Sequence, residues 1–216
     1  MQDDGEANED EERQLRTRRL ILRPPRRSDV AALAAALDDP RIAMGLASVP
    51  YPYRRSDAEG WVDRERARAG SGGVSYVAIS AAEGGFVGAG FACRSDTWPD
   101  GFELSFWIAQ RHWGRGLGTE VAHAVVDDAF LAAGVERIWC AIRVNSTAAR
   151  RVVEKCGFQF RDQRMLRSIA ARGTVPVERF VLERRVWTSL KAWGAEAPAR
   201  RVAGAIDEDD DASDAA

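Results

Sequence analysis

The sequence predicts a single mixed α/β domain with about seven strands and four helices. Nearly half of the 216 residues are apolar, which is enough to bury a sizeable core. Apolar residues recur at strand spacing in some stretches and at helix spacing in others. The two kinds of stretch are interspersed along the chain, with Gly and Pro between them. We place this domain at residues 15–190, between acidic tails at 1–14 and 191–216.

The first half of the chain is predicted to hold two helices and four strands. A strand at Arg19–Arg23 precedes a helix that Ser28 can cap and that Pro40 ends. The run Ser56–Glu59 ("SDAE") matches a capping box and starts a second helix that reaches about Ala69. The strand-like runs that follow are Val74–Ser80, Phe86–Arg94 and Phe102–Ala109.

The second half is predicted to hold two more helices and three more strands. Leu117–Ala133 has helical apolar spacing, and Glu136–Arg143 follows as a strand. A helix at Ser146–Cys156 stops at Gly157, the position that favours a left-handed backbone. The two closing strands are Phe158–Leu166 and Val175–Trp187.

The net charge of −2 conceals an uneven distribution of charge. Thirteen of the 33 acidic residues lie in residues 1–12 and 207–216, while all 31 basic residues lie between residues 13 and 206. The body therefore carries about +11 by formal count, which is compatible with an anionic ligand. Charge-rich tails of this kind predict disorder. We find no nucleic-acid-binding motif, and we expect no direct nucleic-acid partner.

The cellular setting that the sequence predicts is the cytoplasm. Residues 1–12 hold seven acids and no apolar run, so they do not resemble a signal peptide. The longest uncharged run has fourteen residues and is too short and polar to span a membrane. Cys93, Cys140 and Cys156 are scattered, so we interpret them as buried thiols. His112 and His123 have no matching ligand set, so we expect no metal.

The stretch "RHWGRGLGTE" (111–120) holds three alternate glycines between a predicted strand and a predicted helix. Glycine lets a ligand approach the backbone, and unpaired N–H groups at a helix N-terminus bind phosphate. A dinucleotide fingerprint would need Gly where Thr119 stands, and a P-loop would need Gly-Lys-Ser/Thr. The local pattern leaves a phosphate-binding loop of another type, or a turn without a ligand.

Two stretches carry a resemblance to a known family. "ELSFWIAQRHWGRGLGTEVAHAVVDDAF" (103–130) and "VERIWCAIRVNSTAARRVVEKCGF" (135–158) resemble the acetyl-CoA motifs of GNAT N-acetyltransferases. The opening "TRRLILRPPRRSDV" (17–30) is similar to the RimJ/RimL branch, which includes ribosomal-protein N-terminal acetyltransferases. The resemblance implies a mixed, mostly antiparallel sheet that splays between its fourth and fifth strands. The pantetheine of acetyl-CoA would enter between Phe102–Ala109 and Glu136–Arg143.

Carried over by position, the resemblance assigns a pyrophosphate loop. Trp113 stands where the family has Gln or Arg. The backbone N–H groups from Arg115 to Thr119 would hold the pyrophosphate, with Arg111 and Arg115 side chains adding charge-assisted contacts. The predicted loop residues are Trp113, Gly114, Arg115, Gly116, Leu117, Gly118 and Thr119.

Three further positions match the family unevenly. Asn145 stands where the family's Asn contacts the pantetheine region, although Asn is also a good helix N-cap. The family's Ser three residues later is Ala148, and the Tyr that many members use to protonate the leaving thiolate is Val153. A side-chain general acid is therefore in doubt, although a thiolate can leave a thioester without one.

The reaction that the resemblance implies needs an oxyanion donor and a base. We expect a free backbone N–H near Ile108 or Ala109 to donate to the thioester oxygen. Strand alternation places Glu103, Ser105 and Trp107 on one face, which makes Glu103 the candidate base, acting through water. A covalent route through Cys140 or Cys156 lacks an obvious activating base.

The sequence thus predicts transfer of the acetyl group of acetyl-CoA to a primary amine, either a protein N-terminal α-amine or a small-molecule amine. The acceptor would contact the first two helices and the loop between them, about Asp39–Arg55. A homodimer is possible. The alternative is a non-catalytic acetyl-CoA-binding sensor or interaction module of the same fold.

Overall fold

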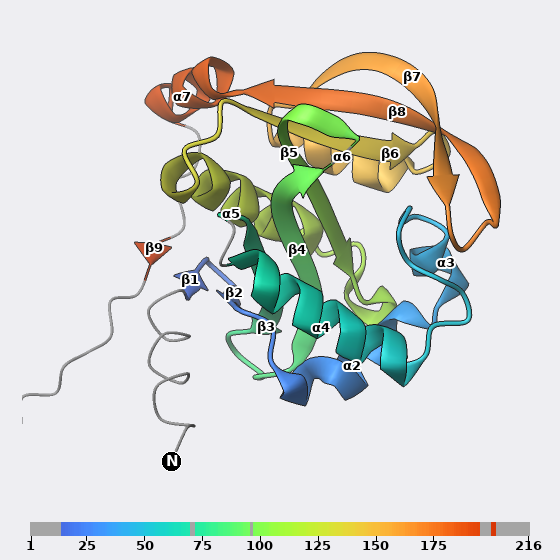
Figure 1. Ribbon diagram of the computed structural model, residues 1–216. Coiled ribbons are helices and arrows are strands. Elements are labelled where there is room, and N and C mark those ends of the chain that lie inside the picture. Colours follow the sequence, from blue (N-terminus) through green and yellow to red (C-terminus); the bar gives the residue numbers. More distant parts are fainter. Residues whose placement is uncertain (1–13, 70–71, 96, 195–199, 202–216) are drawn as a thin grey trace, which may run out of the picture.

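One mixed sheet of nine strands runs through the computed structural model, which describes residues 14–69, 72–95, 97–194 and 200–201 (Figure 1). In chain order the strands are β1 (Leu15–Arg16), β2 (Leu20–Arg23), β3 (Val74–Ser80), β4 (Phe86–Ser95), β5 (Trp98–Ile108), β6 (Arg137–Arg143), β7 (Gln159–Ser168), β8 (Gly173–Glu183) and β9 (Arg200–Arg201). Their order across the sheet is β7-β8-β6-β5-β4-β3-β2-β1-β9. Every neighbouring pair in this sheet is antiparallel except β5 and β6.

Helices cover both faces of the sheet and create two cores. The helical segments are η1 (Arg27–Asp29), α2 (Val30–Leu37), α3 (Pro40–Ala43), α4 (Arg55–Ala69), η2 (Gln110–His112), α5 (Leu117–Ala132), α6 (Thr147–Lys155) and α7 (Arg184–Ala192). Figure 1 shows α2 and α4 across one face and α5 and α6 on the other. The larger core packs α5 and α6 against the sheet, and the smaller core packs α2 and α4. These layers confirm the predicted mixed fold.

The strand β5 alternates between the two cores, as its sequence predicts. Leu104 and Ile108 are buried in the larger core with α5, whereas Trp107 is buried in the smaller core with α2 and α4. A period of two places successive side chains on opposite faces of a strand. From Phe102 to Ile108, β5 therefore separates an α5 side from an α4 side.

The sheet parts between β5 and β6, as the family resemblance predicts. Within these two described strands, parallel pairing is confined to Phe102 with Ile138 and Glu103 with Trp139. On the far side of the gap, β6 pairs with β8 from Arg137 to Arg143. The stretch of β5 from Leu104 to Ile108 therefore has β4 on one edge and an open edge on the other.

The start of α4 differs by two residues from the sequence prediction, in which Ser56 is the N-cap. The helix begins at Arg55, so Ser56 lies inside it and is not the cap. The carboxylate of Asp57 accepts the N–H of Arg54 at 2.8 Å, which is the back-bond of a capping box. The polar cluster predicted a helix start correctly, but the acid rather than the hydroxyl supplies the capping bond.

The last predicted strand, Val175–Trp187, is wrong in its final part. β8 ends at Glu183, and the helix α7 begins at Arg184. Asp127 of α5 accepts the Trp187 indole N–H at 2.7 Å and the Lys191 ammonium at 2.8 Å. Trp187 and Lys191 are four residues apart, so they meet one carboxylate only on a helix. The residues around Trp187 do not reveal this contact with a distant helix, so the local sequence pattern did not predict α7.

Most of both predicted acidic tails lies outside the described residues, and their prediction as tails stays a prediction. β9 falls within the predicted C-terminal tail and pairs antiparallel with β1. Among the described residues, no helix has the length and apolar character required to cross a bilayer.

Candidate active site

The glycine turn between β5 and α5 has the backbone that its sequence predicts. Gly114 and Gly116 both have φ of 74°, in the left-handed region that side chains rarely adopt. A Cβ atom added at Gly114 would meet no atom within 4 Å, so this part of the turn faces open space. The turn therefore exposes its main chain.

The first turn of α5 presents unpaired amides beside these glycines. The first helical bond is donated by the Glu120 N–H to the Gly116 carbonyl at 3.3 Å. The N–H groups of Leu117, Gly118 and Thr119 precede it, so the helix offers them no acceptor. Unpaired donors at a helix N-terminus bind anions, which is the geometry that a diphosphate requires.

Gly118 brings α5 close to the sheet. A Cβ at this position would lie 3.6 Å from Ile108 Cγ1 and 3.7 Å from Val152 Cγ2. A longer side chain would push the helix away from β5 and α6. Both distances are ordinary van der Waals contacts, so the amide cluster lies directly beside the end of β5.

Side chains from distant segments hold the turn in place. The Arg19 guanidinium donates to the Arg115 carbonyl at 2.7 Å and pairs with the Glu120 carboxylate at 2.8 Å. Burial alone would raise the pKa of Glu120, but hydrogen bonds from Thr17 and Arg19 outweigh it and leave this pKa lowered. Glu120 is therefore ionised at neutral pH and anchors Arg19 against the turn.

Trp113 fixes the other end of the turn. Its indole N–H donates to the Ile108 carbonyl at 2.7 Å, while 46% of the residue remains exposed. The Arg41 guanidinium lies over its ring, 5.8 Å from the centroid. Trp113 therefore ties the turn to the C-terminal end of β5.

Two backbone N–H groups were predicted as oxyanion donors, and the structure shows that the prediction is wrong for Ala109. The Ala109 N–H donates to the Val87 carbonyl of β4 at 2.9 Å, so it is not free. Ile108 lies opposite Gly88 in the same antiparallel ladder. Bonded and non-bonded pairs alternate in such a ladder, so the Ile108 N–H points away from β4, toward the gap.

Other predicted contact residues have mixed surroundings. The Arg111 guanidinium donates to the Phe86 carbonyl at 2.7 Å, so this side chain is turned toward β4. Arg115 is exposed on the turn. Asn145 is exposed between β6 and α6, and the N-cap of α6 is Ser146, which removes the capping role considered for Asn145. Val153 is fully buried in the larger core.

Glu103 lies on the α4 side of β5, at the closed end of the gap. Its neighbours in the sheet are Cys93 and Trp139. Ile108 is five positions further along the strand, a distance of about 16 Å. Glu103 is half-buried on the face that also carries Ser105 and Trp107.

A cavity of about 460 Å³ opens on this α4 side of β5. Its walls come from α2, the segment 46–57, α4, β4, β5 and the turn before β8, and the walls include Ser105 and Trp107 of β5. The segment 46–55 falls within the region predicted for the acceptor. We refer to this space as the acceptor-side cavity.

Two hydrogen bonds hold the outer wall of the acceptor-side cavity across the gap. The Arg143 guanidinium at the end of β6 donates to the Met44 carbonyl at 3.0 Å. The Ile169 N–H, in the turn before β8, donates to the Ala47 carbonyl at 2.9 Å. The second half of the sheet therefore supports the segment that closes the cavity.

Sequence reasoning did not single out two polar residues of the cavity, although Tyr53 lies within the region 39–55 predicted for the acceptor. Asp57 and Tyr53 both line it, and the sequence marked Asp57 only as part of a helix start. Burial and the nearby Asp57 carboxylate raise the pKa of Tyr53 to about 12, so its phenol stays protonated at neutral pH. No local motif distinguishes either residue from ordinary loop and helix residues.

The three cysteines are buried free thiols. Burial raises the pKa of Cys93 to about 11, and it raises the pKa of Cys140 and Cys156 further. These thiols carry no thiolate at neutral pH, which argues against the covalent route. Within the described ranges, no group of three or more His, Cys, Asp or Glu residues could hold a metal ion.

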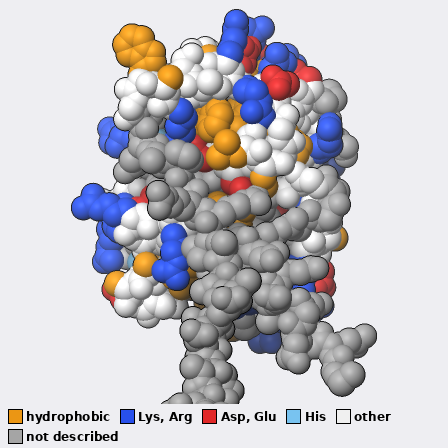
Figure 2. Space-filling view, turned by 90° about the vertical axis from the view of Figure 1, so that its left-hand side faces the viewer, with side chains coloured by type: hydrophobic (Ala, Val, Ile, Leu, Met, Phe, Trp, Pro, Cys, Tyr) orange, Lys and Arg blue, Asp and Glu red, His pale blue; other side chains and the backbone are white. Residues whose placement is uncertain are grey.

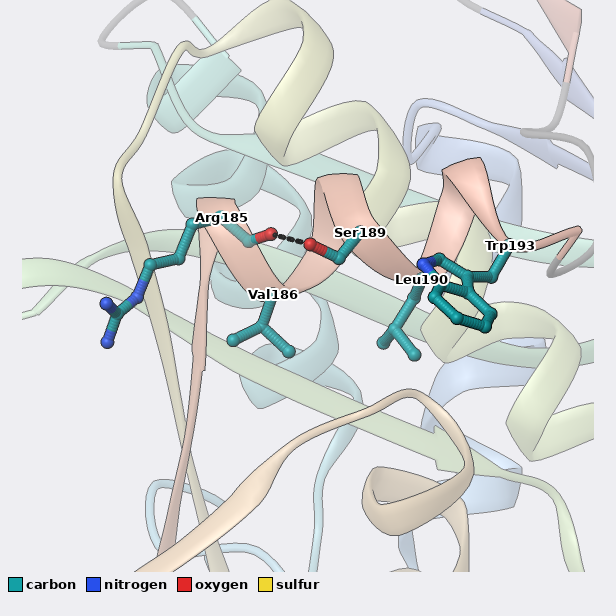
Figure 3. A pocket seen from close by; sticks show the side chains of 5 residues that line it. All are labelled: Arg185, Val186, Ser189, Leu190 and Trp193. Carbon is teal, nitrogen blue, oxygen red and sulfur yellow. Dashed lines mark hydrogen bonds between the residues drawn. The ribbon is translucent and has the colours of Figure 1, made fainter.

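A second hollow lies on α7, away from the gap. Its lining residues are Arg185, Val186, Ser189, Leu190 and Trp193, all from this helix or the residue that follows it (Figure 3). Figure 2 shows exposed hydrophobic side chains on this side of the molecule, with Lys and Arg around them. None of these residues belongs to the glycine turn, the gap or the acceptor-side cavity, so we exclude this hollow from the candidate site.

An open strand edge, a nearby helix N-terminus with unpaired amides and a cavity on the opposite face are features that an acyltransferase needs. The model of the family described as "Acetyltransferase (GNAT) domain" matches residues 19–159. The chain belongs to the GNAT acetyltransferase family, as its motifs suggested.

Solved structures with the same fold are distant in sequence. Mycobacterium smegmatis RimJ in complex with CoA-disulfide has 20% identity and a TM-score of 0.65, covering 84% of this chain and 93% of its own. Spermidine N-acetyltransferase from Vibrio cholerae, in complex with CoA and spermine, has 17% identity and a TM-score of 0.66, covering 78% and 98%. Ribosomal-protein-S5-alanine acetyltransferase from Vibrio fischeri has 14% identity and a TM-score of 0.66, covering 81% and 98%.

Proposed function

We propose that the protein transfers the acetyl group of acetyl-CoA to a primary amine by direct attack in a ternary complex. The observation that carries this proposal is the open edge of β5, where the Ile108 N–H points into the gap. Trp107, the residue before it, lines the acceptor-side cavity. A thioester in the gap and an amine in the cavity would thus meet at the peptide unit that joins Trp107 and Ile108.

The cofactor fits the α5 side of the gap. The amides of Leu117, Gly118 and Thr119 would bind the diphosphate, and the left-handed glycines of the turn would let it approach the backbone. Two of the structural neighbours named above are complexes with CoA or its disulfide, which supports this fit. Asn145 remains a candidate for contact with the pantetheine.

The chemistry requires modest help from the protein. The neutral amine attacks the thioester carbonyl carbon, the oxygen gains charge, and the C–S bond breaks to release the CoA thiolate. The Ile108 N–H donates to the charged oxygen. Glu103 accepts the proton lost by the amine, and its distance along β5 means that water molecules carry this proton. The buried Val153 offers no proton to the thiolate.

The experiment that tests the proposal measures release of CoA thiol from acetyl-CoA. The purified chain is screened against peptides with free N-termini and against small primary amines, while calorimetry measures acetyl-CoA binding. We expect amine-dependent thiol release and an acetylated amine by mass spectrometry. Tight acetyl-CoA binding without release by any amine would favour the alternative, a non-catalytic acetyl-CoA-binding module.

A further inference from the structure

We infer that the acceptor-side cavity receives the apolar or aromatic body of a monoamine, and that polyamines are poor acceptors. This inference rests on the proposed function and names the substrate class for it. The cavity volume, about 460 Å³, lies in the range of small-molecule sites. It is large enough for a ring-bearing group beside the reacting amine.

Most residues of the cavity walls are apolar or aromatic, and three serines, Ser48, Ser56 and Ser105, lie among them. Four aromatic side chains line it from four different elements or loops, namely Tyr53, Trp61, Phe91 and Trp107. Aliphatic residues from α2, the segment 46–50 and the turn before β8 complete the walls. Such a surface gains free energy by covering an apolar group and offers ring faces for stacking.

The charged groups of the cavity do not suit a polycation. The lining contains one carboxylate, Asp57, and one guanidinium, Arg64. Asp57 already accepts the Arg54 N–H at 2.8 Å through one of its oxygens. A polyamine that gives up one proton to react keeps at least one further ammonium, and burying this charge without its own carboxylate is costly.

The position of the aromatic rings determines which end of the acceptor faces the gap. Trp107 immediately precedes Ile108, whose N–H faces the gap. Ser105 lies two residues before Trp107, on the same face of β5. An amine attached directly to an apolar body can rest that body on Trp107 while its nitrogen reaches the open edge. A peptide with an apolar first residue and a small arylalkylamine share this chemistry.

The test compares acceptors on the full chain with saturating acetyl-CoA. The panel is 2-phenylethylamine, spermidine, and two otherwise identical peptides that begin with Phe or Ser. We expect kcat/KM for 2-phenylethylamine to exceed that for spermidine by about tenfold to a hundredfold. The Phe-peptide should exceed the Ser-peptide if the source is a protein N-terminus, whereas a preference for the free amine over both peptides indicates a small molecule.

Two variants test whether the cavity wall is the source of this acceptor preference. Ile169→Glu adds a carboxylate to the cavity wall, and Met165→Glu adds one to a strand position outside it; the two native side chains are 51% and 58% exposed. We expect Ile169→Glu to lower the ratio of kcat/KM for 2-phenylethylamine to that for spermidine by about threefold or more. Met165→Glu should leave the ratio unchanged.

The outcomes separate this inference from the proposed function. Spermidine turnover equal to or faster than that of 2-phenylethylamine would overturn the inference and leave acetyl transfer intact. An unchanged ratio in Ile169→Glu would also overturn it. Acetyl-CoA binding without thiol release by any of the four acceptors would overturn the proposed function, and the inference with it.

Discussion

The two sides of β5 achieve binding in different ways. On the α5 side, the main-chain N–H groups of Leu117, Gly118 and Thr119 have no acceptor within the helix, and the left-handed glycines at 114 and 116 shape the turn that exposes them. On the α4 side, the acceptor-side cavity is enclosed by side chains from six separate parts of the chain. In our proposal, the first side binds the diphosphate of the cofactor, and the second binds the apolar body of the acceptor.

This difference explains how one fold can serve several acceptors. Backbone donors do not change when neighbouring side chains are substituted, so on the α5 side the main constraint falls on the glycines that set the backbone conformation. Side-chain walls change with each substitution, so the α4 side is where specificity varies. Substitutions on the two sides should therefore affect different kinetic quantities.

The largest effect is expected at Glu103, the proposed base on the α4 side. Glu103→Gln should lower kcat by about a hundredfold or more, because general-base catalysis is typically worth that much, and should leave the Kd for acetyl-CoA unchanged. Assays of CoA thiol release give kcat, and calorimetry gives the Kd for acetyl-CoA. The matched control is Asp57→Asn, which keeps an oxygen for the Arg54 N–H and should change KM rather than kcat. A loss of kcat in Asp57→Asn instead would move the base to the cavity wall.

A smaller effect is expected on cofactor binding. Gly116→Val should raise the Kd for acetyl-CoA about tenfold or more, because its φ of 74° costs about 1–2 kcal/mol for a residue with a side chain and the turn would move to relieve it. Calorimetry with acetyl-CoA measures this. Gly84→Val, at φ of 66° in the turn between β3 and β4, carries the same backbone penalty far along the chain. An equal rise in Kd in both variants would show that the change is a general loss of stability.

On the α4 side, a wall substitution should affect the acceptor alone. Leu46→Ala removes apolar surface from the cavity and should raise KM for the preferred acceptor about threefold to tenfold, with the Kd for acetyl-CoA unchanged. Steady-state kinetics at saturating acetyl-CoA measure the KM. Leu131→Ala, at a position 60% exposed on α5, is the control. A change in cofactor affinity in Leu46→Ala would mean that the two sides are not independent.

The smallest effect concerns the ion pair that holds the glycine turn. The pKa of Glu120 is lowered in the folded protein, so its contribution to stability is present above its usual value of 4.5 and is lost as pH falls through the lower, folded value. Denaturant unfolding between pH 7 and pH 3 should therefore show a steeper acid loss in the native chain than in Glu120→Gln. Parallel curves for the two proteins would show that Glu120 is not a source of acid sensitivity.

Local sequence patterns were enough to predict most of the fold. The strand at Val74–Ser80 has the predicted bounds, and Gly157 ends α6 with the predicted left-handed backbone, at φ of 88°. Both signals are contained in a few neighbouring residues. The stretch 184–187 was predicted wrongly because its helix is fixed by Asp127, more than fifty residues earlier.

The sequence by itself determined the glycine turn and the order of the elements, because each depends on the conformational freedom or apolar spacing of consecutive residues. Only the tertiary structure decided that Ile108, and not Ala109, turns its N–H to the gap, because this depends on the register between β5 and β4. The acceptor-side cavity was decided in the same way, since its walls meet only when the two halves of the sheet and the helices on the α4 side are packed together.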